Sequence, residues 1–316
     1  MKVIAMGKDI TEICGNLSIR GSTSQVARTL ELNVIRPKAD YYLPSVDIKL
    51  GSTILVIDKG ATQFSGIVWF RDMDDNKAEQ RITAYDMSIY VAKSEPEKAV
   101  FENQSCSDIA SSVLGELGLP VGRLEPGEVV TINGRNQTAY DIIMGAYAKA
   151  SRKNKKVYHM VVENGAIHVV EKGQTVGALL EYRVQDLPGT LVGLSFEESI
   201  DNMINKTKVI RDKENDEKKE GNENSGDQEA FGLVQKIIRG EVEDTQGILK
   251  GARTDINVEC FGDWAYKTGY SVNVKGVNAK GKYYIAEDVH SVKDNIHTVK
   301  LQLTTENTMK GADGND

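Results

Sequence analysis

Cysteine is scarce in this sequence of 316 residues, and the three cysteines that occur stand far apart. Cys14, Cys106 and Cys260 include no C-x-x-C pair, and their number is odd. Such a set argues against a disulfide framework and against the paired spacing of a zinc site. We therefore predict three buried free thiols, with no metal and no other cofactor.

Long apolar runs are missing as well. No stretch approaches the ~18 apolar residues of a membrane-spanning helix, and the opening MKVIAMGKDITEI lacks the apolar segment of a signal peptide. We expect the chain to be made in a cytoplasm, to carry no signal peptide and not to insert into a membrane.

The sequence also lacks a concentrated basic segment. Acidic residues outnumber basic ones by 46 to 39, which gives a net charge of −7, and the block SRKNKK at 151–156 fits a short solvated turn. Binding to a phosphate backbone needs clustered Lys and Arg, so this balance argues against nucleic acid as the main partner. The length and the hydrophobic content of 40% indicate a soluble globular chain of about two domains.

Common catalytic motifs are absent too. The sequence has no G-x-S-x-G, no H-E-x-x-H, no G-x-x-x-x-G-K-[ST] and no G-x-G-x-x-G after a strand. His159 and His168 fall in one predicted hairpin, each opposite a valine, and Glu125 and Glu128 flank a Pro-Gly turn. Carboxylates that work as a catalytic pair face each other across a cleft, which a turn does not provide. We predict no catalytic residue and no enzymatic activity.

What the sequence does contain is β pattern at both ends of the chain, with a different pattern between them. Residues 1–95 read as consecutive strands; in VARTLELNVI, for example, Arg28, Leu30 and Leu32 share one parity of a strand with one buried face. Many short strands at this spacing are typical of an antiparallel barrel or sandwich.

Residues 96–175 predict an α+β insert. SCSDIASSVLGELGLP and NQTAYDIIMGAYAKASRKN have helical spacing, and the first helix is expected to end at Gly118. The pair Asn164-Gly165 lies between two apolar runs and predicts a two-residue hairpin turn.

Strand patterns resume over residues 176–306 and predict a second antiparallel barrel. Residues 211–229 hold 12 charged residues in 19 and are expected to form a mobile loop, and residues 307–316 a flexible tail. The predicted fold class is mainly β, with two antiparallel β-barrels flanking a small α+β domain.

The closing segment YYIAEDVHSVKDNIHTVKLQLT, residues 283–304, predicts a hairpin. Pairing Val289 with Val299 leaves a three-residue loop at 293–295 and places His290 and His297 on opposite faces. In this register the two imidazoles cannot form a metal or acid–base cluster unless a bulge intervenes. The outer face then presents three candidate partner-contact residues, Asp288, His290 and Lys300.

The order of these segments resembles the baseplate hub proteins of contractile phage tails and related tailocins, of the XkdQ/YqbQ type of the defective prophage element PBSX. The resemblance rests on hydrophobic and turn patterns along nearly the whole chain. The segments that carry it are FSGIVWFRD, RITAYDMSIYVAKS, TAYDIIMGAYAKASRKNKKVYHMVVENGAIHVVEKG, SFEESIDNMINKTKV, FGLVQKII and GKYYIAEDVHSVKDNIHTVKLQL. No family pattern maps onto residues 211–229.

The resemblance implies two related hub barrels in each chain and three chains in a ring with pseudo-sixfold symmetry. Such a homotrimer would contact the tail tube protein, the central spike protein and the baseplate wedge proteins, in a particle assembled in the bacterial cytoplasm.

Two alternatives stay open: a tail-associated cell-wall hydrolase and a cell-wall-binding module. The hydrolase would need a carboxylate pair or a metal, and the module would need exposed aromatic side chains; the only tryptophans, Trp69 and Trp264, stand in contexts that favour packing.

Overall fold

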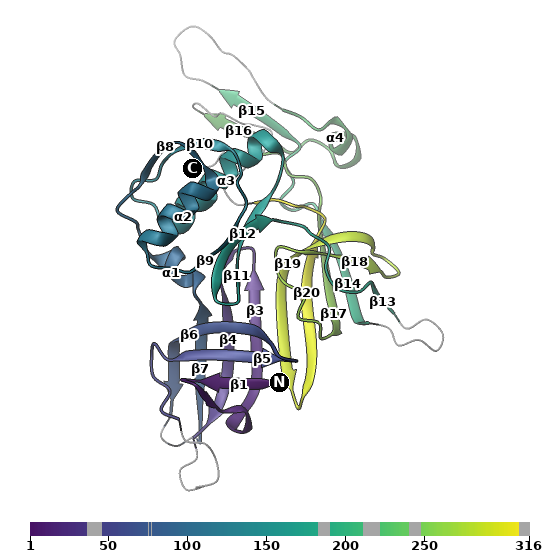
Figure 1. The fold of residues 1–316 in the computed structure, drawn as a ribbon. Helices are drawn as coiled ribbons and strands as arrows, with labels where there is room; N and C mark the ends of the chain where they lie inside the picture. The colour runs from purple at the N-terminus through teal and green to yellow at the C-terminus, as the bar shows by residue number, and fades with distance from the viewer. Residues whose placement is uncertain are drawn as a thin grey trace.

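The structure, a computed structural model, describes residues 1–36, 46–74, 76, 78–182, 190–210, 222–239 and 248–309 (Figure 1). Within these residues the chain is mainly β, as predicted, and in this part no helix is long and apolar enough to cross a membrane. The helices are η1 (Thr11–Ile13, a 3₁₀ helix), α1 (Ser88–Lys93), α2 (Cys106–Glu116), α3 (Ala139–Asn154) and α4 (Ser225–Phe231).

The strands follow one another along the chain in three groups. Those of the first β part are β1 (Lys2–Ala5), β2 (Lys8–Asp9), β3 (Cys14–Ser22), β4 (Gln25–Ile35), β5 (Thr53–Asp58), β6 (Ala61–Met73) and β7 (Glu79–Asp86). Those of the insert are β8 (Val100–Ser105), β9 (Val121–Leu124), β10 (Val129–Asn133), β11 (Tyr158–Glu163) and β12 (Ala166–Glu171). The remaining strands are β13 (Leu180–Glu181), β14 (Leu191–Ser199), β15 (Lys206–Ile210), β16 (Gln235–Arg239), β17 (Arg253–Phe261), β18 (Ser271–Lys275), β19 (Lys280–Lys293) and β20 (Ile296–Thr304).

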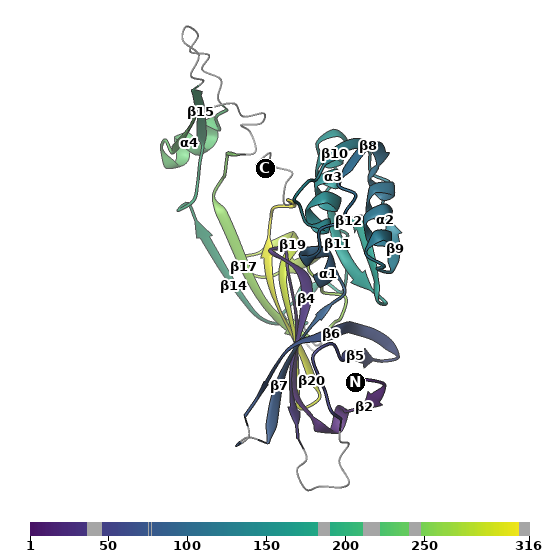
Figure 2. The ribbon, with the colours of Figure 1, turned by 90° about the vertical axis from the view of Figure 1, so that its left-hand side faces the viewer.

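One 13-stranded sheet runs through both β parts of the molecule. Its main path has the order β14-β17-β20-β19-β3-β4-β7-β6-β5-β1-β2, and β13 and β18 pair beside it. The sheet curls strongly between its two halves (Figure 2). Apart from β15 and β16, which form a two-stranded sheet of their own, the described strands of the two flanking parts therefore join in one sheet.

The junction is made by the long strand β19. Its beginning pairs with β18 of the second β part, and its end, from Glu287 to Val292, pairs antiparallel with β3 of the first part. The opposite edge of β19 pairs with β20. A strand of 14 residues is long enough to belong to both parts, and this length is what makes the sheet continuous.

Three clusters of buried apolar side chains follow the three segments expected from the sequence. One includes Leu30 and Ile82 of the first β part, one includes Val113 and Ile142 of the insert, and one includes side chains of β17, β18 and β20. The limits of the three domains stay a prediction.

Local signals in the insert are confirmed. The side chains of Ser105 and Thr138 cap α2 and α3, and the backbone just after α2 turns at Gly118, whose φ is +65°. Asn164 and Gly165 have φ values of 49° and 78° and join β11 to β12, as expected for this turn. His159 lies opposite Val170 and His168 lies opposite Val161, also as predicted.

The charged stretch and the tail differ in part from the prediction. Residues 211–221 lie outside the described residues, but residues 225–229 belong to α4, because the Asn224 side chain accepts from the Asp227 amide and caps this helix. In the predicted tail, Met309 is buried in the core of the insert, and the Lys172 ammonium donates to the Thr308 carbonyl over 2.6 Å. Residues 310–316 lie outside the described residues.

Candidate functional site

The turn of the β19–β20 hairpin contains two residues. Asp294 and Asn295 have φ values of 51° and 61°, and Val289 lies opposite Lys300. The predicted three-residue loop and the predicted pairing of Val289 with Val299 are therefore wrong. Asp and Asn both tolerate the left-handed region, which permits a turn with two positive φ angles.

A β-bulge at Ala286 reverses the facing of the residues that follow it. The register shifts between Ile285 and Glu287, and both Ile285 and Asp288 are buried although three positions separate them. Strict alternation would place them on opposite faces of the strand.

The two-residue turn sets a register in which the two histidines of the hairpin meet. His290 lies opposite Val299 and His297 lies opposite Val292, so that the imidazoles are diagonal neighbours on one face. The distance between His290 Nδ1 and His297 Nε2 is 3.0 Å. The prediction that they lie on opposite faces is wrong, although among the described residues no three His, Cys, Asp or Glu side chains gather in a metal-binding group.

A backbone carbonyl fixes one donor of this pair. His290 Nε2 lies 2.8 Å from the Tyr266 carbonyl oxygen, which can only accept, so His290 donates from Nε2. Its Nδ1 faces Nε2 of His297 across the contact between the two rings. Burial and, to a smaller extent, the neighbouring His290 lower the pKa of His297 to about 4, which keeps His297 neutral near pH 7.

An indole ring covers the histidine pair. Trp264 stacks on His290 at 4.8 Å and on His297 at 4.1 Å between ring centroids. Its Nε1–H donates to the Asp58 carboxylate over 3.0 Å, and Asp58 also contacts the amino group of Met1. The stack thus links the hairpin to β5 of the first β part.

A buried ion pair lies on the same face of β19. Arg28 of β4 donates from Nη1 and Nη2 to the two carboxylate oxygens of Asp288, over 2.9 and 2.5 Å. The amide and hydroxyl of Thr268 donate to the same carboxylate. Burial acts to raise the pKa of Asp288, but the Arg28 charge and the hydrogen bonds from His290 and Arg28 together hold this pKa well below its ordinary value.

We call the set of Arg28, Asp288, His290, His297 and Trp264 the polar joint. Its members come from both β parts, and its buried carboxylate and imidazole groups are hydrogen-bonded to one another or to the backbone. Arg28 Nε is buried without a hydrogen-bond partner among the described residues, but its two Nη groups are bonded to Asp288. A buried hydrogen-bonded network of this kind holds packed elements in one arrangement.

The predicted contact surface needs correction. Asp288 and His290 have no exposed surface, so they do not lie on an outer face of this chain. Lys300 is exposed, and its role in a partner contact stays a prediction. The bulge accounts for the difference, because it turns Asp288 and His290 inward.

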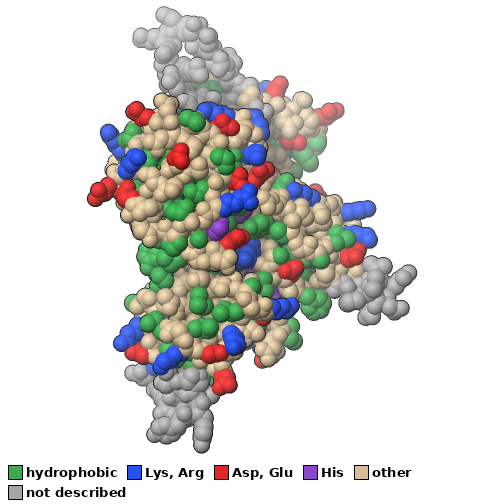
Figure 3. Space-filling view, in the orientation of Figure 1, with side chains coloured by type: hydrophobic (Ala, Val, Ile, Leu, Met, Phe, Trp, Pro, Cys, Tyr) green, Lys and Arg blue, Asp and Glu red, His purple; other side chains and the backbone are tan. Residues whose placement is uncertain are grey.

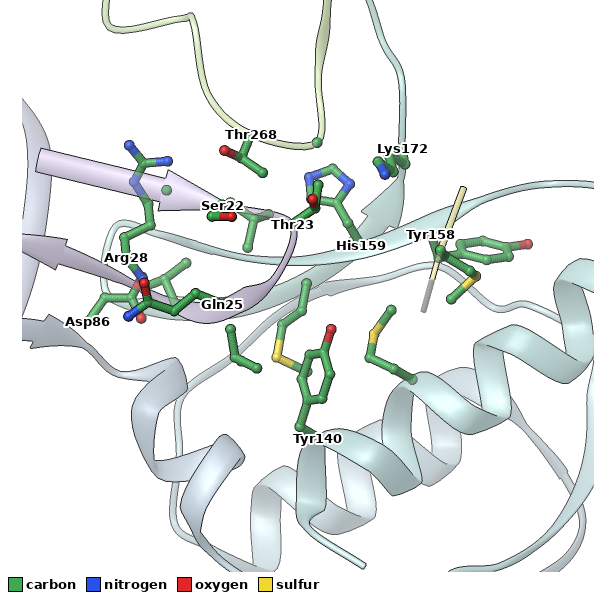
Figure 4. A pocket seen from close by; sticks show the side chains of 18 of the residues that line it. Ser22, Thr23, Gln25, Arg28, Asp86, Tyr140, Tyr158, His159, Lys172 and Thr268 are labelled. Atoms are coloured by element: carbon green, nitrogen blue, oxygen red, sulfur yellow. The ribbon is translucent and has the colours of Figure 1, made fainter. Parts of the chain in front are cut away.

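A small cavity of about 100 Å³ lies beside the polar joint, where the β3–β4 hairpin, the insert and the Thr268–Gly269 loop meet (Figure 4). Its lining includes Arg28, Tyr140, His159 and Lys172. Pockets for metabolite-sized ligands are typically ~300 Å³ or larger, so this one does not fit a nucleotide or an oligosaccharide.

His159 fixes the insert to the sheet at this place. Its ring lies edge-on to Tyr270, and a Cβ on Gly269 would lie 2.5 Å from it, so only glycine fits there. Both ring nitrogens are buried without a hydrogen-bond partner among the described residues, and burial lowers the pKa of His159 to about 4. A neutral His159 in a packing role fits its position opposite a valine in the hairpin.

The cysteines are free thiols, as predicted. Cys106 and Cys260 are buried, whereas Cys14 is only partly buried. Burial raises the pKa of Cys14 and of Cys260 to about 12, which makes both thiols poor nucleophiles at neutral pH.

Comparison with known proteins places the chain in a family. A family model described as YQBQ-like matches residues 17–304. The chain belongs to the YQBQ-like family. The phage-like element PBSX protein XkdQ of Bacillus subtilis (strain 168), to which this YQBQ-like chain is similar, is 22% identical over 316 residues, with 94% of each chain covered. The resemblance stated from the sequence is confirmed.

Solved structures share the fold of this YQBQ-like protein along its length. The 43 kDa tail protein of prophage MuSo2 from Shewanella oneidensis matches with a TM-score of 0.73 and 14% identity, over 96% of this chain and 97% of that one. The E. coli c3393 protein matches with a TM-score of 0.54 and 13% identity, over 93% and 74%. That protein is described as a component of the type VI secretion system with structural similarity to the T4 bacteriophage tail proteins gp27 and gp5.

Proposed function

We propose that this YQBQ-like chain is a structural baseplate hub of a contractile tail, of a phage or of a tailocin. Three copies form a ring that adapts the sixfold tail tube to the threefold central spike. Family membership over residues 17–304 and a fold shared from end to end with a prophage tail protein support this role.

The observation that carries the proposal is the continuous sheet through the two β parts. In a ring of three chains, two similar barrel-like parts of each chain can present six similar surfaces to a sixfold partner. The two parts must then keep one relative orientation. The β19–β3 pairing and the polar joint supply that constraint, because both connect residues of the first β part to residues of the second.

The proposed partners are proteins: the tail tube, the central spike and the baseplate wedge. The likeness to c3393, with its described similarity to gp27 and gp5, supports the tail context. Basic and acidic side chains are interspersed on the face shown in Figure 3, and no continuous basic area covers the described part of that face. This distribution fits protein partners better than a phosphate backbone.

The two alternatives, a cell-wall hydrolase and a wall-binding module, gain no support from the tryptophans. Trp264 is stacked in the polar joint, and Trp69, which is 38% exposed, packs edge-on against Tyr85 and Tyr90. Both are engaged in packing within the chain.

The experiment is purification of the particle that contains the chain. A tagged copy expressed in the strain that produces the particle is expected to pull down a tube, a sheath and a spike protein together, whereas an untagged strain gives none. Absence of the chain from particles that hold those three proteins would contradict the proposal, as would a cleared band of this chain on a peptidoglycan gel.

A further inference from the structure

An arm projects from the end of the large sheet beyond β14 (Figures 1 and 2). We define the arm as residues 200–210 and 222–239, which contain β15, β16 and α4. Strands β15 and β16 form a two-stranded parallel sheet of their own. Parallel sheets normally have both faces covered, and an isolated pair of strands is only marginally stable in water.

The interior of the arm is organised by a polar side chain. Asn205 is fully buried; its side-chain amide donates to the Gly232 carbonyl over 2.6 Å, and its side-chain oxygen accepts from the Val234 amide over 2.8 Å. Its backbone carbonyl accepts from Asn224 and from the Gln228 side chain. Helix α4 contributes no buried residue. Hydrogen bonds therefore hold the arm more than a core of its own does.

Met203 and Val209 of the arm are buried, but four other apolar side chains of the arm face outward. Phe231 is 46% exposed, Leu233 62%, Val234 39% and Ile237 49%. They lie within seven positions of one another, from the end of α4 into β16. Apolar side chains gathered in this way on a projecting element mark a protein–protein contact.

The free edge of strand β14 is a candidate binding surface for the arm, and we call this edge the seat. Strand β14 is the end strand of the large sheet, and within the described residues it pairs only with β17, so its other edge keeps unpaired backbone groups. Leu194 and Phe196 pack against the core of the second β part but are only partly buried. Glu197 and Glu198 are exposed on this strand, and the arm carries exposed Lys236 on β16.

We propose that the arm of one copy docks on β14 of the next copy, with the 231–237 segment covering the free edge of that strand. The inference rests on the proposed ring of three chains and names the contact that closes it. Since β14 leads directly into the arm, every copy presents the seat and the arm at the same end of its sheet. A head-to-tail contact of this kind repeats from copy to copy and closes into a ring when the rotation permits.

The first test replaces an outward apolar side chain of the arm by a charge. Sedimentation of the full chain over a concentration series should show trimers for the wild type. Leu233→Glu should weaken their association by roughly tenfold or more. The control is Val277→Glu, because Val277 is 90% exposed in the turn between β18 and β19, outside the arm. Unchanged association of the Leu233→Glu chain overturns the proposal, and so does a wild type that stays monomeric.

The second test identifies the seat by reversing charges. Glu197→Lys with Glu198→Lys should weaken association, and adding Lys236→Glu should restore it. A charge reversal without effect, or one that Lys236→Glu does not rescue, overturns β14 as the seat. Circular dichroism of each variant confirms that the fold is retained.

These outcomes separate the arm from the hub role. If the chain occurs in tail particles and Leu233→Glu still assembles normally, the arm contact is wrong and the hub role stands. If the chain is absent from particles while the arm variants abolish self-association, the hub role is wrong and the contact between copies stands.

Discussion

Arg28 and Asp288 lie 260 positions apart in the sequence and form a buried ion pair of the polar joint. Asp288 is fully buried, and the Arg28 side chain is 13% exposed. A buried pair adds little net stability compared with apolar residues of the same shape, but removing one partner leaves a buried charge without compensation. The pair therefore acts mainly to fix how the two β parts meet.

The residue-scale prediction concerns this carboxylate. Asp288→Asn should lower the free energy of unfolding by about 3–5 kcal/mol, because Arg28 loses its counter-charge in a buried site. Lys300→Ala is the control on the exposed face of the same hairpin and should change it by less than about 0.5 kcal/mol. Chemical denaturation measures both; equal effects of the two variants would show that the ion pair does not carry this role.

Part of the polar joint could be predicted from the sequence. Arg28 shares its parity in strand β4 with Leu30 and Leu32, and a charged residue on an apolar face predicts a buried partner. The identity of that partner was not visible, since Asp288 turns inward only because of the bulge at Ala286. The contacts of Thr268 and Asp58 with the joint could not be predicted from the sequence, because a loop and a distant strand bring these residues to it.

At the scale of elements, predictions that depend on neighbouring residues succeeded. The end of α2 before Gly118 and the Asn164-Gly165 turn need only short-range geometry. The predicted register of the β19–β20 hairpin was wrong because the actual register depends on distant contacts. The Ala286 carbonyl accepts from the Thr23 amide, and the Ile285 carbonyl accepts from the Gly269 amide. Such contacts select a bulge that alternation alone does not reveal.

The element-scale prediction concerns the pH dependence of the packing of this hairpin. The pKa of His297 falls from its ordinary 6.5 to about 4 in the folded chain, so the unfolded chain binds more protons between these values. The free energy of unfolding should therefore decrease as the pH falls from 6.5 towards 4. His159, whose pKa is lowered to about 4 as well, contributes in the same direction.

Thermal unfolding of the wild type and of His297→Gln at several pH values checks this expectation. The variant loses the ring stacked on Trp264 and should be less stable at pH 7, but its stability should depend less on pH over this window. An unchanged pH dependence in the variant would mean that His297 is protonated equally in both states.

At the scale of the whole molecule, the order of the three parts could be predicted from the sequence, but the joining of the two β parts in one sheet could not. Composition and periodicity predicted β segments on either side of an α+β insert, and the three core clusters follow that division. The pairing of β19 with β3 joins residues such as Ser22 and Glu287, which are 265 positions apart. No local pattern encodes a contact over that separation, which is why two separate barrels were expected where one sheet exists.

The central claim is that three copies of this chain form the hub ring. Quantitative mass spectrometry of purified particles, with the tube protein as internal standard, measures the copy number directly. The proposal predicts three copies of this chain for each ring of six tube subunits that it meets. Six copies, or a single copy, would contradict it.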